Sequence, residues 1–148
     1  MMSEPPISEG GCLCGQVRYR LEGEIGGDVA HCHCSICRRA AGSPAVTWLT
    51  LPKRNFTLTA GTPSVYRSSP HGERAFCASC GSPISFWSRE RPDEIDVTVA
   101  TLDHPERVAP KRHVWASARL PWLVLDPDLP SEQGETLWDQ GAPPPDQG

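Results

Sequence analysis

Near its amino terminus the chain reads Gly11-Cys12-Leu13-Cys14-Gly15, and much later it reads Cys77-Ala78-Ser79-Cys80-Gly81. Two close cysteine pairs that lie far apart in sequence supply the four thiolates of a closed tetrahedral zinc site. A flat strand holds side chains two residues apart at about 6.5 Å, whereas the sulfurs around zinc lie within about 4 Å of one another. The chain must therefore bend at the first pair, which the flanking glycines allow. We expect this site to join the first strand to a hairpin over residues 76–87.

A second cluster, Cys32-His33-Cys34-Ser35-Ile36-Cys37, places three thiols within one short segment. No other cysteine is left to complete it, so the fourth position belongs to water, a substrate atom or a histidine. Extended geometry turns His31 and His33 away from the face that carries Cys32 and Cys34, which argues against both as ligands. The remaining histidines, His71, His104 and His113, stay open as candidates for a closed structural site.

A disulfide framework is the alternative explanation for the seven cysteines. The count is odd, the spacings are too tight for bridges between distant strands, and Met1 to Glu9 is polar with no apolar run. The segment does not resemble a signal peptide, so we expect a cytoplasmic protein whose thiols stay reduced. Clustered thiols in that compartment favour metal binding.

Composition limits the partners. The 148 residues carry a formal charge of −4, which leaves no electrostatic footprint for nucleic acid or an anionic membrane surface. No stretch approaches the roughly 20 apolar residues of a membrane span. The sequence does not indicate an oligomeric state.

The periodicity predicts a mainly β fold. With 13 glycines and 16 prolines, short elements joined by turns are favoured over long helices. Period-two alternation predicts half-buried strands over 17–21 and 95–99. Further strands are expected over 46–51, 56–58, 64–66, 75–76, 84–87 and 113–115. One short helix is expected over 35–41, with Ser35 as its N-cap and Gly42 at its end.

The domain boundaries follow from where this periodicity stops. Residues 1–9 and 139–148 lack it and are expected to be disordered tails. Residues 10–138 form one domain, with no linker or repeat.

The charge of the three-cysteine cluster suggests a chemistry if the cluster is open. Three thiolates around Zn²⁺ leave a net charge of about −1, which makes the metal a poor activator of water but gives it affinity for a fourth sulfur. A small thiol would be bound there and its pKa lowered, which delivers the reactive thiolate. Arg38 and Arg39, directly after the cluster, could bind a carboxylate of that molecule.

These motifs together resemble the glutathione-dependent formaldehyde-activating enzyme (GFA) family, also called centromere-protein-V-like. The resemblance runs from about Gly10 to Pro130. It rests on the 11–19 segment, the 32–38 segment with Gly42-Ser43, the 76–83 segment, Thr101-Leu102-Asp103, His113-Val114-Trp115 and Pro121-Trp122.

The resemblance implies a β-tent fold of antiparallel sheets and two zinc ions per chain. The structural zinc would be held by Cys12, Cys14, Cys77 and Cys80, and the catalytic zinc by Cys32, Cys34 and Cys37. The implied activity is that of a carbon-sulfur lyase, S-(hydroxymethyl)glutathione synthase, with glutathione and formaldehyde as small-molecule partners.

A second function class stays open at this point. The domain could be a non-catalytic zinc scaffold or a protein that only binds a small thiol, because fold and motif alone do not fix function. A scaffold for nucleic acid or cytoskeleton would be expected to carry a basic extension, and this acidic chain has none. We therefore favour the enzyme.

Overall fold

The structure is a computed structural model that describes residues 6–134. Within this range the chain forms ten strands: β1 (Ile7–Gly11), β2 (Arg18–Glu22), β3 (Asp28–Cys32), β4 (Val46–Pro52), β5 (Phe56–Ala60), β6 (Ser64–Arg67), β7 (Gly72–Phe76), β8 (Pro83–Ser88), β9 (Glu94–Thr98) and β10 (Arg112–Val114). One α-helix, α1 (Ser35–Ala41), and short 3₁₀ turns at 53–55, 99–101, 105–107 and 116–118 complete it. The predicted mainly β class with one short helix is confirmed.

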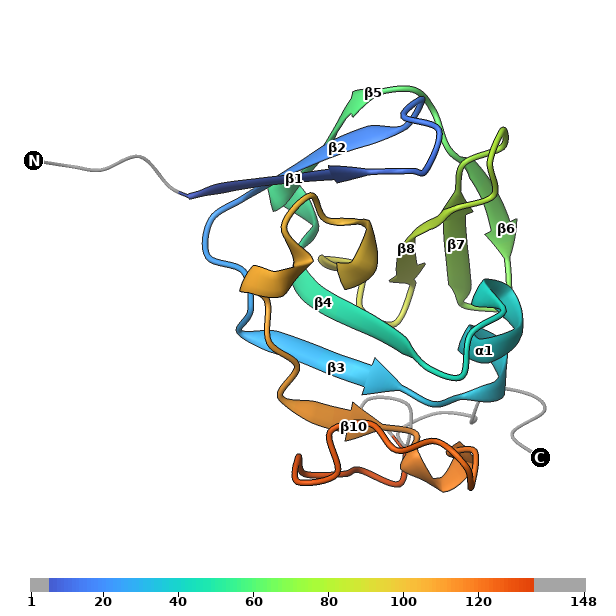
Figure 1. Ribbon diagram of the computed structural model, residues 1–148. Coiled ribbons are helices and arrows are strands. Elements are labelled where there is room, and N and C mark those ends of the chain that lie inside the picture. The colour runs from blue at the N-terminus through green and yellow to red at the C-terminus, as the bar shows by residue number, and fades with distance from the viewer. Residues whose placement is uncertain (1–5, 135–148) are drawn as a thin grey trace, which may run out of the picture.

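Two sheets make up the fold (Figure 1). The smaller has the strand order β1-β2-β5, and the larger has the order β10-β3-β4-β9-β8-β7-β6. All pairs are antiparallel except β10 with β3, which run parallel. β10 is the last of the described strands, and it lies at the edge of the large sheet beside β3, in the same direction as β3.

The apolar residues form two clusters. The larger contains the inward residues of both sheets, among them Tyr19, Leu21, Leu49 and Ile84, and it reaches the first cysteine pair at Cys12. The smaller cluster surrounds the three-cysteine segment. Each cysteine cluster is therefore continuous with its own part of the core.

The expected amino-terminal tail needs a correction. β1 begins at Ile7, inside the segment 1–9, and pairs with β2 from Ile7–Glu22 to Gly11–Arg18. Its sequence lacks the apolar alternation that signals a strand, and hydrogen bonding to β2 supplies the order instead. The expected carboxy-terminal tail, 139–148, lies outside the described residues.

The helix differs from the prediction at its start only. Its N-cap is Cys34, whose sulfur accepts a hydrogen bond from the Cys37 amide, and Ser35 is the first helical residue. Gly42, at φ 64°, ends it as expected. No helix among the described residues has the length and apolar character needed to cross a membrane.

Candidate metal centres and the adjoining cavities

The four-cysteine cluster lies where the two sheets meet. Cys12 and Cys14 occupy the turn after β1, and Cys77 and Cys80 occupy the turn after β7. All four sulfurs lie within 4.8 Å of one another, with 3.6 Å between Cys12 and Cys14 and 3.7 Å between Cys14 and Cys77. These separations fit a tetrahedral zinc ion, so the site would bind the small sheet to the large one.

Hydrogen-bond donors surround these sulfurs. The Val17 amide donates to the Cys12 sulfur over 3.2 Å, and the Ser82 hydroxyl lies 3.3 Å from the Cys80 sulfur. The hydroxyl and amide of Ser82 lower the pKa of the Cys80 thiol to about 5. Gly81, at φ 82°, allows the tight turn that brings these groups together. The environment of Cys80 therefore favours thiolate, the form that binds metal.

The three-cysteine cluster is buried at the end of β3 and the start of α1. The sulfurs of Cys32, Cys34 and Cys37 lie within 4.8 Å of one another. Across residues 6–134, no histidine or carboxylate joins them. Three sulfurs in this arrangement fit a zinc ion that keeps its fourth position for a ligand from outside the protein.

The histidines near this cluster are bonded elsewhere. His33 and His113 are fully buried, and His33 Nε2 lies 2.8 Å from His113 Nδ1. His113 Nε2 contacts the Asp126 carbonyl, while His31 lies between Thr47 and the Asp126 carboxylate. Burial lowers the pKa of His33 to about 4, so its ring is neutral. The prediction that His31 and His33 point away from the sulfurs is confirmed.

The two remaining histidines lie at the surface. His71 is 3.8 Å from Glu90 and His104 is 3.4 Å from Glu106. No described histidine is therefore a fourth ligand of the three-cysteine cluster.

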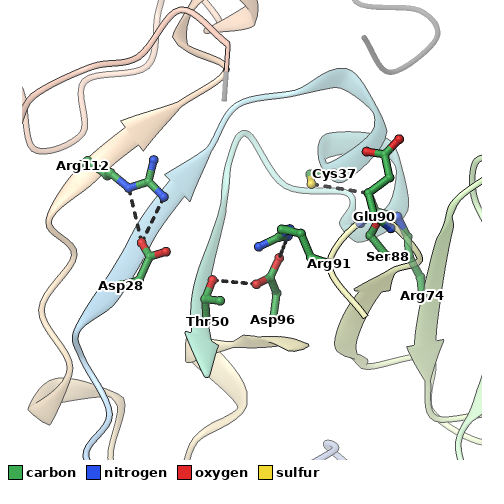
Figure 2. A network of polar contacts seen from close by, with 9 residues as sticks. All are labelled: Asp28, Cys37, Thr50, Arg74, Ser88, Glu90, Arg91, Asp96 and Arg112. Carbon is green, nitrogen blue, oxygen red and sulfur yellow. Dashed lines mark hydrogen bonds and ion pairs between the residues drawn. The ribbon is translucent and has the colours of Figure 1, made fainter. Parts of the chain in front are cut away.

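Arg74, on β7, contacts the Cys37 sulfur of this cluster (Figure 2). Its Nη2 donates to the Cys37 sulfur over 3.6 Å, its Nε donates to Ser68, and its guanidinium stacks on the Phe86 ring. The thiols of Cys32 and Cys34, and then the Arg74 charge, hold the pKa of Cys37 well below its usual range. Arg74 thus stabilises the thiolate that a metal would need.

A small cavity opens beside the three sulfurs. Its volume is about 50 Å³, and its walls include Trp48, Phe86 and Trp115, with Asp96 and Thr50 at a polar end. Trp115 adopts φ 55°, a region that costs a bulky residue energy. The surrounding fold holds this strained residue as one wall of the cavity.

Asp96 supplies the charge at the polar end. Its Oδ1 accepts a hydrogen bond from the Thr50 hydroxyl over 2.6 Å, and its Oδ2 accepts one from Arg91 over 3.1 Å. Figure 2 shows Asp96 between these two partners, with Asp28 and Arg112 paired nearby. Burial raises the pKa of Asp96 above its usual range, against the opposing effect of Arg91.

The amino-acid pattern of a known family matches this chain over residues 7–118, described as glutathione-dependent formaldehyde-activating enzyme. That match covers the strands, both cysteine clusters and the walls of the small cavity. The chain belongs to the GFA family.

Individual proteins are also similar to this chain, and the name of one of them agrees with the GFA assignment. A protein of Halomonas elongata named "Putative glutathione-dependent formaldehyde-activating enzyme" is 29% identical over 134 residues, covering 81% of this chain and 82% of the relative. An uncharacterized lyase of Schizosaccharomyces pombe is 31% identical over 81 residues, covering 55% of this chain and 58% of the relative. A crystal structure of a Rhodobacter sphaeroides protein superposes with a TM-score of 0.55 at 27% identity, covering 64% of this chain and 87% of that one.

In this GFA chain a larger cavity of about 720 Å³ adjoins the small one, and Cys37, Trp48 and Arg74 line both. Arg39 also lines the larger cavity. Arg38 points elsewhere, because its guanidinium donates to the Ala118 carbonyl. Of the two arginines predicted to contact a carboxylate, Arg39 therefore lines the larger cavity, whereas Arg38 is bonded to the backbone.

Sequence reasoning missed Arg74 and Asp96. The alternation of β9 suggested that Asp96 lies on a polar, solvent-facing side, yet that side forms the cavity wall. The pairing of Asp96 with Phe86, and of Phe86 with Arg74, is a matter of strand register that one sequence does not reveal.

Proposed function

We propose that this chain is a zinc-dependent carbon-sulfur lyase-type enzyme that joins a glutathione-like thiol to a formaldehyde-like aldehyde, giving an S-hydroxymethyl thiol. One observation carries the proposal. Three buried sulfurs without a fourth described protein ligand adjoin two cavities, one large and one small. That arrangement gives two reactants a shared meeting point at the metal-binding sulfurs.

The residues present fit two zinc ions with different roles. Four sulfurs would enclose one ion completely and make it structural, whereas Cys32, Cys34 and Cys37 would hold the other with one position open. When bound there, zinc would lower the pKa of a substrate thiol and so raise the fraction present as thiolate.

The protein's own residues position the thiol. The larger cavity has room for a tripeptide-sized molecule, and Arg39 and Arg74 supply positive charge for its carboxylates. Arg38, predicted as a second carboxylate contact, would need to release the Ala118 carbonyl to reach the substrate. Arg39 is therefore the better supported of the two.

The walls of the small cavity would then exclude bulk water from the reaction. Trp48, Phe86 and Trp115 form an apolar lining beside the sulfurs. Excluding water strengthens the attraction between the Arg74 guanidinium and a thiolate, because the local dielectric is lower. The thiolate attacks the carbonyl carbon, and the product is a hydroxymethyl thioether.

The experiment is exchange NMR on formaldehyde and glutathione, with wild type compared with Cys34→Ala and Arg39→Ala. Wild type should accelerate exchange over buffer, Cys34→Ala should abolish the acceleration, and Arg39→Ala should weaken glutathione binding. A matched Arg38→Ala variant tests the other arginine. If wild type shows no acceleration with any cellular thiol, the non-catalytic scaffold replaces the enzyme; if it binds thiols without acceleration, a small-thiol binding protein does.

A further inference from the structure

A row of side chains crosses the large sheet beneath the three-cysteine cluster. Backbone pairing places Thr50 opposite Asp96, Asp96 opposite Phe86, and Phe86 opposite Arg74. Residues paired across neighbouring strands present their side chains on the same face of a sheet. The row therefore runs from Asp96 to the arginine that contacts the Cys37 sulfur.

This row forms one side of the small cavity. β9 and β7 are separated by β8, so their backbones lie roughly 10 Å apart. The Arg74 side chain reaches over Phe86 to the Cys37 sulfur, and Asp96 faces the same cavity from two strands away. A small molecule in this cavity would lie between the sulfurs and the Asp96 carboxyl.

The volume selects what can enter. A cavity needs at least about 10–15 Å³ on this measure to hold one water molecule. The small cavity, at about 50 Å³, holds roughly three or four water-sized groups. That space accepts a one- or two-carbon aldehyde and excludes a tripeptide, which requires the larger cavity.

The Asp96 carboxyl has hydrogen-bonding capacity left for such a molecule. Thr50 and Arg91 each occupy one of its oxygens, whereas a carboxylate offers about four acceptor positions. Only 13% of the Asp96 side chain is exposed. A hydroxyl group inside the cavity would find an acceptor there that is largely shielded from bulk water.

We propose that the small cavity is the carbonyl subsite and that Asp96 is the catalytic residue that protonates the carbonyl oxygen as the thiolate adds. This inference rests on the proposed function and deepens it. The sulfur forms a bond to the carbonyl carbon, the π electrons move to oxygen, and that oxygen takes the Asp96 proton. The proton released when the thiol ionises returns to Asp96 through solvent water, so thiol plus aldehyde gives the hydroxymethyl thioether with no oxidant or reductant.

The groups around Asp96 shift its pKa in opposite directions. Burial raises its pKa, while Arg91 and the Thr50 hydroxyl lower it, and the Asp28 carboxylate on β3 raises it. Arg112 on β10, Arg74 on β7 and the three thiols also line the cavity. A raised pKa increases the fraction of acid near neutral pH, which suits a proton donor.

The test measures forward and reverse exchange between formaldehyde and glutathione, with zinc content and glutathione affinity determined separately. Asp96→Asn should lower both rates by about 10²-fold, since acid–base catalysis typically contributes that much or more. Zinc content and glutathione affinity should not change. Asp93→Asn is the matched control, because Asp93 is exposed and lies outside the cavity.

The pH profile adds a readout that a purely structural role would not move. The wild-type forward rate, corrected for thiolate concentration, should fall as pH rises through the Asp96 pKa. This falling limb of the pH profile should be absent from Asp96→Asn. Thr50→Val removes a donor that stabilises the ionised carboxylate, so the limb should move to higher pH. Thr50→Val therefore tests the role of Asp96 as proton donor even if Asp96→Asn does not fold.

The outcomes separate the two claims. No acceleration by wild type overturns the proposed function and the role of Asp96 with it. Acceleration by wild type that Asp96→Asn retains within twofold, or a limb that Thr50→Val leaves in place, overturns the role of Asp96 alone.

Discussion

At the scale of single residues, Arg74 acts directly on the three-cysteine cluster. Its guanidinium donates a hydrogen bond to the Cys37 sulfur, and its position is fixed by Ser68 and Phe86. A positive charge beside a thiolate favours the form that binds metal. Removing the charge should therefore change the cluster's metal affinity without unfolding the protein.

We predict that Arg74→Gln weakens zinc binding at the three-cysteine cluster by about 10-fold or more, as losses around metal ligands commonly do. The loss should be greatest at low pH, because the pKa of Cys37 rises when the arginine is removed and thiol must ionise before it binds metal. Chelator competition across a pH series measures it. Arg67→Gln, on the exposed side of β6, is the control, and equal affinity in both variants would contradict the prediction.

A second residue-scale prediction concerns Gly10, where the chain passes close to Tyr19. A Cβ at Gly10 would overlap the Tyr19 hydroxyl, which is buried and lies 2.7 Å from the Thr101 hydroxyl. Gly10→Ala should therefore destabilise the fold by about 1–3 kcal/mol through overpacking. Urea unfolding gives the value. Gly27→Ala is the control, since a Cβ there meets nothing within 4 Å, and equal stability of the two variants would refute the argument.

At the scale of elements, β10 supports the three-cysteine segment from behind. It pairs with β3 as its parallel neighbour, and His113 on β10 bonds to His33 between two of the cysteines. The same strand leads directly into Trp115, a wall of the small cavity. The position of the cysteines thus depends on an element that lies far away in sequence.

We predict that His113→Phe costs about 1–3 kcal/mol, because it leaves the buried His33 nitrogen without its partner. Amide hydrogen exchange should increase in β10 and in the segment up to residue 134. His104→Phe, at the surface, should leave both measurements unchanged. Unaltered exchange in His113→Phe would show that the histidine pair does not hold β10.

The elements also show what the sequence could predict. The strands with strong alternation and the helix that Gly42 ends lie where expected, because local patterns determine them. β1 and β3 were missed, since Ile7–Gly11 carries glycines and Asp28–Cys32 is buried nearly throughout, so neither alternates. The cysteine sets followed from spacing, whereas Arg74 and Asp96 depend on register between strands that only the folded structure reveals.

At the scale of the whole molecule, the four-cysteine cluster joins two sheets and the three-cysteine cluster lies beside the cavities. Loss of a metal that connects sheets removes binding free energy that is also folding free energy, about 10 kcal/mol or more for a structural zinc. An ion with an open position contributes far less to the fold. The two clusters should therefore differ in their effect on stability.

We predict that Cys80→Ser abolishes cooperative folding while Cys34→Ser lowers the melting temperature only modestly. Thermal unfolding followed by circular dichroism, with metal analysis, measures both. In wild type, a chelator should remove the zinc of the three-cysteine cluster first, with the fold intact. Equal instability of the two variants, or simultaneous release of both ions, would make the three-cysteine cluster structural.

The central claim is that the three-cysteine cluster holds a metal ion with one position open to a thiol. Cadmium-113 NMR of the cadmium-substituted protein tests it at both clusters at once, because the resonance depends on how many sulfurs surround the ion. We predict two resonances, one for each cluster. The resonance of the three-cysteine cluster is identified by its absence from Cys34→Ser. Only this resonance should move, toward the chemical shift of an ion with four sulfur ligands, when glutathione is added. A single resonance, or two that glutathione leaves in place, would contradict the account.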